Sequence, residues 1–222
     1  MKQTIWSRGE ISIADELMEL APKLTQEFLE YHKDFDTTFS GGISYAASNP
    51  EAILDEHEKD VWKVEGLRYS LPEKNIEQNM FLQPKTRMIF PTASSLTQKY
   101  IAHVGCSGYS VLDAAGIIKP HVDIENSSRK TVRIHIPLII PEGDIALEVG
   151  GIKQDWSNLF AFDNAELHSA YNNTNKRRLI YILDISRSFV VSNWINNYMG
   201  SVGPIQKTTA TLTHHRRKLC QT

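Results

Sequence analysis

Hydrophobic and polar residues follow two different rhythms along this chain, and the change falls near Gly105. Beyond that residue, short β-branched apolar runs are separated by turn residues, which is typical of an antiparallel sandwich or a small barrel. The strand-length runs are "YSVLDAAG", "IIKPHVDI", "KTVRIHIPLII", "IALEVGG", "IKQDW", "NLFAFDN", "AELHSAYNN" and "RRLIYILDIS". We therefore expect a mostly β core with flanking helices.

Helical spacing governs the first part of the chain instead. Apolar residues recur at three- to four-residue intervals between Ser12 and His32, which predicts an amphipathic helix packed on a larger body. They are Ile13, Leu17, Leu20, Ala21, Leu24, Phe28 and Leu29. Ser12 is placed to cap this helix, and Asp15 and Glu16 lie in its first turn, where negative charge is favoured.

The segment between this helix and Gly105 gives weaker signals. It predicts a Gly-Gly turn at 41–42, a short helix from about Pro50, a loop, a helical or mixed segment over 75–90, and a further helix in "TASSLTQKYIAHVG". We expect one compact domain in three parts. Residues 1–95 form a helical or mixed extension packed on the core, 96–199 form the core, and 200–222 form a flexible basic tail.

Composition excludes several classes of protein. The chain has 222 residues, 41% hydrophobic and 23% charged, which is enough for one buried core. A net charge of −2 argues against nucleic-acid and anionic-membrane partners, and we interpret the local basic run "HHRRKL" as a solvated tail. No apolar signal segment or run of eighteen apolar residues occurs, so we expect a cytoplasmic protein without a membrane anchor.

The two cysteines, Cys106 and Cys220, do not form the pattern of a disulfide framework. This usage is consistent with a reducing compartment. The sequence leaves the oligomeric state open, although the run "SFVVSNWINNYMG" predicts a helix that covers a sheet edge or pairs subunits.

A cluster of metal-binding residue types lies in the predicted strands. His121 and Asp123 are two residues apart, so on a strand both side chains project to the same face, and His168 lies on a later strand. Two imidazoles and a carboxylate with open positions are the ligand set of non-haem Fe(II) oxygenases. A single H-x-D pattern also arises by chance, and a single strand histidine is more often an ordinary core or surface residue.

An arginine follows on the next predicted strand. A guanidinium binds a carboxylate through two parallel hydrogen bonds, so Arg178 is a candidate anchor for a dicarboxylate. Arg177 and Arg178 face opposite sides of a strand, so at most one enters the barrel, and the spacing from His168 favours Arg178.

The motifs "PHVD", "VRIHIPLIIPE", "FDNAELHSAYN" and "RRLIYILDI" resemble the aspartyl/asparaginyl β-hydroxylase family of Fe(II)- and 2-oxoglutarate-dependent oxygenases. The resemblance spans about 109–185 and implies a double-stranded β-helix, or jelly-roll, core. It implies that His121 and His168 bind iron, that Arg178 and Ser110 hold the distal carboxylate of 2-oxoglutarate, and that Arg133 and His135 lie near its oxoacid end.

This sequence departs from the family's best-known animal members at one ligand position. Those members carry glycine where this chain has Asp123, so here H-x-D would complete the triad, as in many bacterial relatives. Asp163 and Asn164 precede the strand of His168, and they either support the site or form an ordinary turn.

The resemblance implies Fe(II), 2-oxoglutarate and O₂ as the reactants that accompany the substrate. It implies hydroxylation of an sp³ carbon in an amino-acid-like substrate that is free, tethered to a carrier protein, or an Asp or Asn residue of a peptide. Two other classes remain open: a cupin-like metal enzyme that does not use 2-oxoglutarate, and a non-catalytic β-barrel binding module.

Overall fold

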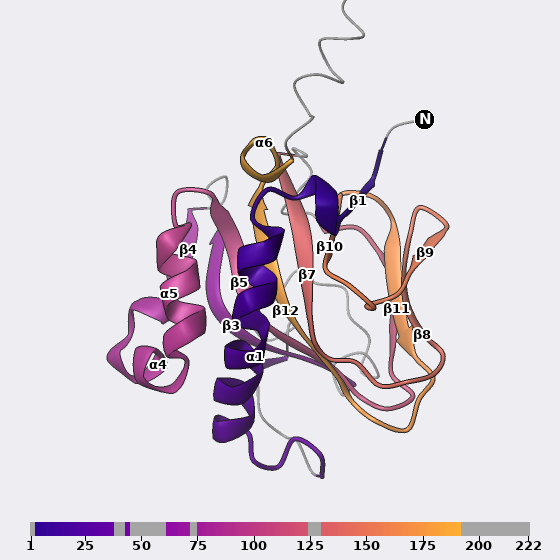
Figure 1. The fold of residues 1–222 in the computed structure, drawn as a ribbon, viewed down its shortest axis with the longest axis horizontal. Coiled ribbons are helices and arrows are strands. Elements are labelled where there is room, and N and C mark those ends of the chain that lie inside the picture. Colours follow the sequence, from indigo (N-terminus) through magenta and orange to yellow (C-terminus); the bar gives the residue numbers. More distant parts are fainter. Residues whose placement is uncertain (1–2, 38–42, 45–60, 72–74, 124–129, 192–222) are drawn as a thin grey trace, which may run out of the picture. The chain divides into compact units, whose positions relative to one another are not determined.

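The computed structural model describes residues 3–37, 43–44, 61–71, 75–123 and 130–191, and these residues form two antiparallel sheets with helices against one of them (Figure 1). The strands are β1 (Ile5–Ser7), β2 (Ile43–Ser44), β3 (Trp62–Leu71), β4 (Ile76–Asn79), β5 (Val104–Leu112), β6 (Ile117–His121), β7 (Thr131–Ile139), β8 (Ile145–Val149), β9 (Ile152–Gln154), β10 (Phe160–Phe162), β11 (His168–Asn172) and β12 (Arg178–Ser186). The α-helices are α1 (Ala14–Tyr31), α4 (Pro84–Ile89), α5 (Pro91–Lys99) and α6 (Arg187–Val190), and the short 3₁₀ turns are η1 (Arg8–Glu10) and η3 (Met80–Leu82).

The strand order is that of a jelly roll. The major sheet has the order β1-β10-β7-β12-β5-β3-β2, with β4 paired to β3, and the minor sheet has the order β6-β11-β8-β9. From β5 to β12 the chain passes back and forth between the two sheets, which confirms the predicted double-stranded β-helix core.

Both faces of the major sheet are buried, and the two-residue period of a strand separates them. On β7, Val132, Ile134 and Ile136 join a core formed with residues of α1 and α5, whereas Arg133 and His135 face the space between the sheets. Figure 1 shows α4 and α5 on the side of the major sheet away from β8, β9 and β11. Because both faces of β7 are buried, its sequence is almost continuously apolar, and the polar residues Arg133 and His135 lie on the face toward the minor sheet.

The first helix forms where the sequence predicts it, but its predicted cap is wrong. The residue before α1 is Ile13, and no side chain caps the helix start. The Ser12 amide donates to the Val190 carbonyl at 2.9 Å, and Ile11 bridges to Val191. These backbone bonds tie Ser12 to the end of α6, and so it does not act as a cap.

The predicted loop before residue 75 is also wrong, because β3 is a ten-residue strand beside β5. Its pattern breaks at Gly66, where the register with β5 shifts, so that Trp62 and Val64 face the inter-sheet core and Leu67 faces the helices. A Cβ at Gly108 on β5 would lie 2.5 Å from the Glu65 carbonyl oxygen, which explains glycine at this crossing.

The remaining predictions meet different outcomes. Residues 75–90 are mixed, as expected, with β4, η3 and α4, and the helix expected in "TASSLTQKYIAHVG" is α5, which ends at Lys99. Cys106 is a free cysteine, and no helix among the described residues is long and apolar enough to cross a membrane. The Gly-Gly turn, the helix at Pro50, Cys220, the basic tail and the continuation of "SFVVSNWINNYMG" beyond Val191 lie outside the described residues.

Candidate metal centre and its cavity

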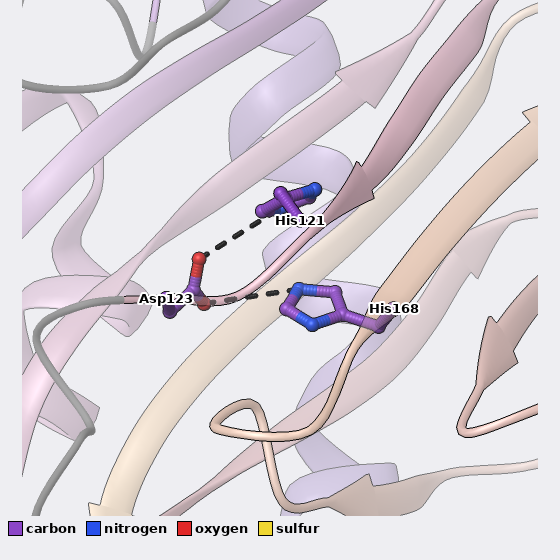
Figure 2. Close-up of side chains that lie close together, drawn as sticks. All are labelled: His121, Asp123 and His168. Atoms are coloured by element: carbon purple, nitrogen blue, oxygen red, sulfur yellow. Dashed lines mark ion pairs between the residues drawn. The ribbon is translucent and has the colours of Figure 1, made fainter.

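Three side chains of the expected metal cluster converge at one end of the minor sheet (Figure 2). His121 ends β6, His168 begins β11, and the two residues are paired across the strands. Asp123 follows β6, with Oδ1 3.6 Å from His121 Nε2 and Oδ2 3.9 Å from His168 Nε2. One ligand atom from each of the three residues lies within 4.8 Å of the others, which is close enough for them to share one ion.

Both imidazoles present the same nitrogen to this point. His121 Nδ1 lies 2.8 Å from the Lys119 carbonyl oxygen, and His168 Nδ1 lies 2.9 Å from the Glu166 carbonyl oxygen. A carbonyl oxygen only accepts, so each Nδ1 donates its proton there and each Nε2 is the nitrogen left to face the other ligands, the usual arrangement of metal-binding histidines. Burial lowers the pKa of His168 to about 4, so this imidazole is neutral at pH 7.

Asp123 is a buried carboxylate held by two donors. One terminal nitrogen of Arg133, Nη1, lies 2.7 Å from Asp123 Oδ2, and Asn164 Nδ2 donates to the same oxygen at 3.0 Å. Burial alone raises the pKa of Asp123, but Arg133 and the two imidazoles outweigh it and hold the pKa below its usual value. The carboxylate is therefore ionised and able to bind a cation.

Arg133 is itself fixed by a second carboxylate. Its Nε and Nη2 donate to the two oxygens of Asp184 at 2.7 and 2.8 Å. The sequence did not single out Asp184, although an acid inside the apolar run "RRLIYILDIS" was the available signal.

The cavity beside this cluster is lined by every predicted site residue except Asp123. Arg178 lies in it, 1% exposed, and donates to Ser110 Oγ at 3.1 Å. Its Nε has no hydrogen-bond partner, and among the described residues Arg178 has no carboxylate partner. Burial lowers the pKa of this guanidinium to about 9, which means that the charged form is poorly solvated here. Arg177 instead turns to Asp113.

Two tryptophans, which the sequence analysis did not identify, contact the residues at the Arg178 end of the cavity. Trp62 Nε1 donates to Ser110 Oγ at 3.0 Å, so that this oxygen accepts from both Trp62 and Arg178. Both lone pairs are then used, and the Ser110 proton remains to be donated to a third group. The Trp156 ring lies 5.0 Å from the guanidinium carbon of Arg178.

Trp156 also sets the protonation pattern of His135. Its Nε1 donates to His135 Nδ1 at 3.1 Å. Burial holds the pKa of His135 well below its usual value, so the ring is neutral and carries its proton on Nε2. His135 therefore lines the cavity as a hydrogen-bond donor through Nε2.

The turn before β11 combines both interpretations made from the sequence. Asp163 accepts from the Ala165 amide at 3.2 Å, as in an ordinary turn, and pairs with Arg187 at 2.8 Å. Asn164 contacts Asp123 directly.

Comparison with known proteins gives one extended match. A family model described as aspartyl/asparaginyl beta-hydroxylase matches residues 7–188. A search of curated proteins found no match.

Solved structures give low similarities. The chain is similar to a prolyl hydroxylase of Trichoplax adhaerens in complex with a hypoxia inducible factor peptide, with 12% identity, 77% of this chain and 79% of that chain covered, and a TM-score of 0.45. It is similar to an oxidoreductase of the 2OG-Fe(II) oxygenase family from Burkholderia pseudomallei, with 13% identity, 61% of this chain and 73% of that chain covered, and a TM-score of 0.41. It is also similar to a cupin domain from Schizosaccharomyces pombe, with 11% identity, 70% of this chain and 80% of that chain covered, and a TM-score of 0.34. Similarities this low carry no argument about function.

Proposed function

We propose that this chain, which belongs to the aspartyl/asparaginyl β-hydroxylase family, is an Fe(II)- and 2-oxoglutarate-dependent dioxygenase. Its proposed substrate is an amino acid or amino-acid-like compound, free, tethered to a carrier protein, or an Asp or Asn residue of a peptide, hydroxylated at an sp³ carbon. One observation carries the proposal: a His-Asp-His cluster and a buried guanidinium without a carboxylate partner among the described residues adjoin one cavity.

The cluster fits a divalent metal ion. His121 Nε2 is buried and has no hydrogen-bond partner among the described residues, and a metal ion would use its lone pair. Two imidazoles and one carboxylate are the donor set expected for Fe(II) with open positions. His121, Asp123 and His168 are the proposed ligands.

The other end of the cavity fits a carboxylate. Arg178 offers a guanidinium that burial has stripped of water, and Ser110 has a proton to donate because Trp62 and Arg178 use its lone pairs. We assign the distal carboxylate of 2-oxoglutarate to this pair. His135 and Arg133 line the same cavity and are the proposed contacts of the oxoacid end.

Charge balance also favours this pair of ligands. Four of the buried charged groups lie at the cavity or directly behind it, and the charges of Asp123, Asp184, Arg133 and Arg178 sum to zero. A divalent cation and a dicarboxylate bring equal and opposite charges, so binding both together keeps the site neutral, whereas binding either one alone does not. Burying either ligand alone leaves two uncompensated charges, which is costly in a poorly solvated site.

Bound Fe(II) would supply the centre at which O₂ oxidises 2-oxoglutarate to succinate and CO₂ while one oxygen atom enters a substrate C–H bond as hydroxyl. The chain's own residues bind the dicarboxylate and hold it in one orientation. Arg178 and Ser110 fix one end of the dicarboxylate, Trp156 restricts the Arg178 side chain, and the apolar side chains of Ile180 and Ile182 exclude water from the cavity wall.

The test is the visible charge-transfer band of a 2-oxoglutarate chelate on Fe(II). Anaerobic Fe(II)-loaded protein is titrated with 2-oxoglutarate, and wild type is compared with His168→Ala, Arg178→Ala and the matched control Arg177→Ala. We expect a band in wild type and in Arg177→Ala, no band in His168→Ala, and a much higher 2-oxoglutarate requirement in Arg178→Ala. Iron binding without a band would favour the cupin-like alternative, and no iron binding would favour a non-catalytic binding module.

A further inference from the structure

We propose that Asp123 is held as a one-oxygen metal ligand by Arg133, Asp184 and Asn164, here called the Asp123 clamp. Within it, Arg133 and Asn164 are positioning residues that act on the metal through Asp123. The inference rests on the proposed metal centre and assigns a role to groups that lie behind its ligands.

The two oxygens of Asp123 have different surroundings. Oδ2 receives Arg133 at 2.7 Å and Asn164 Nδ2 at 3.0 Å, so both of its in-plane lone pairs are used. Each oxygen lies near one imidazole, Oδ1 3.6 Å from His121 Nε2 and Oδ2 3.9 Å from His168 Nε2, but no hydrogen bond reaches Oδ1 within the described part of the chain. The geometry therefore leaves Oδ1 for the metal.

Asp184 fixes the direction of Arg133. Its two oxygens accept from Nε and Nη2, and two parallel bonds hold a guanidinium in one plane. Arg133 and Asp184 lie directly opposite each other on β7 and β12, so the sheet register sets their pairing. The remaining terminal nitrogen of Arg133 then points at Asp123 Oδ2.

Asn164 holds Asp123 from the other side. Its side-chain amide donates to Oδ2, and its backbone carbonyl accepts from the Asp123 amide at 3.1 Å. Asn164 is completely buried, in the turn that leads into β11 and His168. One turn therefore sets the position of two ligands relative to each other.

The Asp123 clamp removes the freedom of the carboxylate to rotate or to bind through both oxygens. Outer hydrogen bonds of this kind typically change metal affinity by about 10- to 100-fold. Because Arg133 uses three of its five N–H donors on Asp123 and Asp184, its contacts assign it to the metal ligand in addition to any contact with the cosubstrate.

The test measures Mn(II) affinity calorimetrically in metal-free protein without 2-oxoglutarate, so that only the metal centre is probed. The variants are Asn164→Ala, which keeps the backbone bond, Asn164→Asp, which keeps the volume but replaces the donor, and Arg133→Lys. The controls are Asn172→Ala, a completely buried asparagine that donates to backbone carbonyls away from the cluster, and Arg177→Lys, an arginine paired with Asp113. We expect affinity to fall about 10- to 100-fold in the three variants and to be unchanged in both controls.

A double-mutant cycle shows whether Asn164 acts through Asp123. In an Asp123→Ala background, adding Asn164→Ala should leave the residual Mn(II) affinity unchanged, because the group it positions is gone. An equal loss in both backgrounds, or wild-type affinity in all three clamp variants, overturns the Asp123 clamp while the metal centre stands. Absence of Mn(II) binding by wild type, both alone and with 2-oxoglutarate present, overturns both the clamp and the proposed function.

Discussion

The two faces of the major sheet are both buried, yet they hold their buried charges in different ways. On the helix side, Glu27 accepts from the Tyr109 hydroxyl at 2.6 Å and from the Thr92 and Ala93 amides at 2.7 and 2.9 Å. On the inner side, within the described part of the chain, Arg178 donates to Ser110 and its Nε has no hydrogen-bond partner. A buried charge whose bonds are complete supports the fold, whereas one with bonds left over indicates a binding site.

The comparison predicts that changes on the helix side alter stability and changes on the inner side alter binding. The strands are shared, since Leu179, Tyr181 and Leu183 pack with the helices from the same strand that carries Arg178 and Asp184. Four variants, from the largest expected effect to the smallest, can break or sharpen this separation.

Phe28→Ala should have the largest effect, on stability alone. Phe28 is fully buried on α1, with its ring centroid 4.9 Å from that of Tyr109. Truncation of such a side chain costs about 3–5 kcal/mol. Denaturant unfolding of the metal-free protein measures the loss, and Mn(II) affinity of the folded variant should equal that of wild type. A fall in Mn(II) affinity would mean that the two faces are coupled.

Arg178→Met should have the opposite signature. We expect 2-oxoglutarate affinity of the metal-loaded protein to fall by about 2 kcal/mol or more, roughly 30-fold, because the carboxylate loses a charged partner. Metal-free stability should stay level or rise, since a poorly solvated charge is replaced by an apolar side chain of similar length. Unfolding and ligand titrations measure both, with Arg177→Met as the control that keeps 2-oxoglutarate affinity. A loss of stability without a loss of affinity would make Arg178 a structural residue.

Glu27→Gln should lower stability by about 1–3 kcal/mol, because the amide group of glutamine cannot accept from every donor that faces Glu27. Glu30→Gln, at an exposed position on the same helix, is the control and should change little. Thermal and denaturant unfolding measure the difference. Changed 2-oxoglutarate binding in Glu27→Gln would contradict the assignment of this face to stability.

Trp156→Phe should have the smallest effect. It keeps an aromatic ring near Arg178 but removes the donor to His135 Nδ1, so that the His135 proton is no longer confined to Nε2. One hydrogen bond of this kind is worth about 1 kcal/mol, so 2-oxoglutarate affinity should fall roughly 5-fold. Titration of the metal-loaded protein measures it, and unchanged affinity would remove His135 Nε2 from the proposed cosubstrate contacts.

The strands of the core were predictable because their signal is local. β5 to β12 consist of short apolar runs, and the polar residues inside those runs, such as Arg133 and His135, fall on alternate positions. β3 was not recognised because lysine, glutamate and arginine interrupt its apolar positions and Gly66 shifts its register. Its side chains change face at the point where a simple alternation would continue.

The partners of the site residues were less predictable than the residues themselves. Asp184 meets Arg133 because β12 and β7 pair in one particular register, which no local pattern specifies. Trp62 reaches Ser110 from 48 positions earlier in the chain, on the strand that the pattern missed. The assignments of ligands and cosubstrate contacts themselves remain predictions that the experiments above can decide.

The position of β3 has a consequence for producing the protein. β3 is hydrogen-bonded along one edge of β5, from Trp62 opposite Leu112 to Tyr69 opposite Cys106. A fragment starting at residue 96 would expose that edge as a row of unpaired amides and carbonyls, a template on which the strands of other copies can add. Such a fragment should aggregate during expression, and a soluble shortened form would need to retain β3.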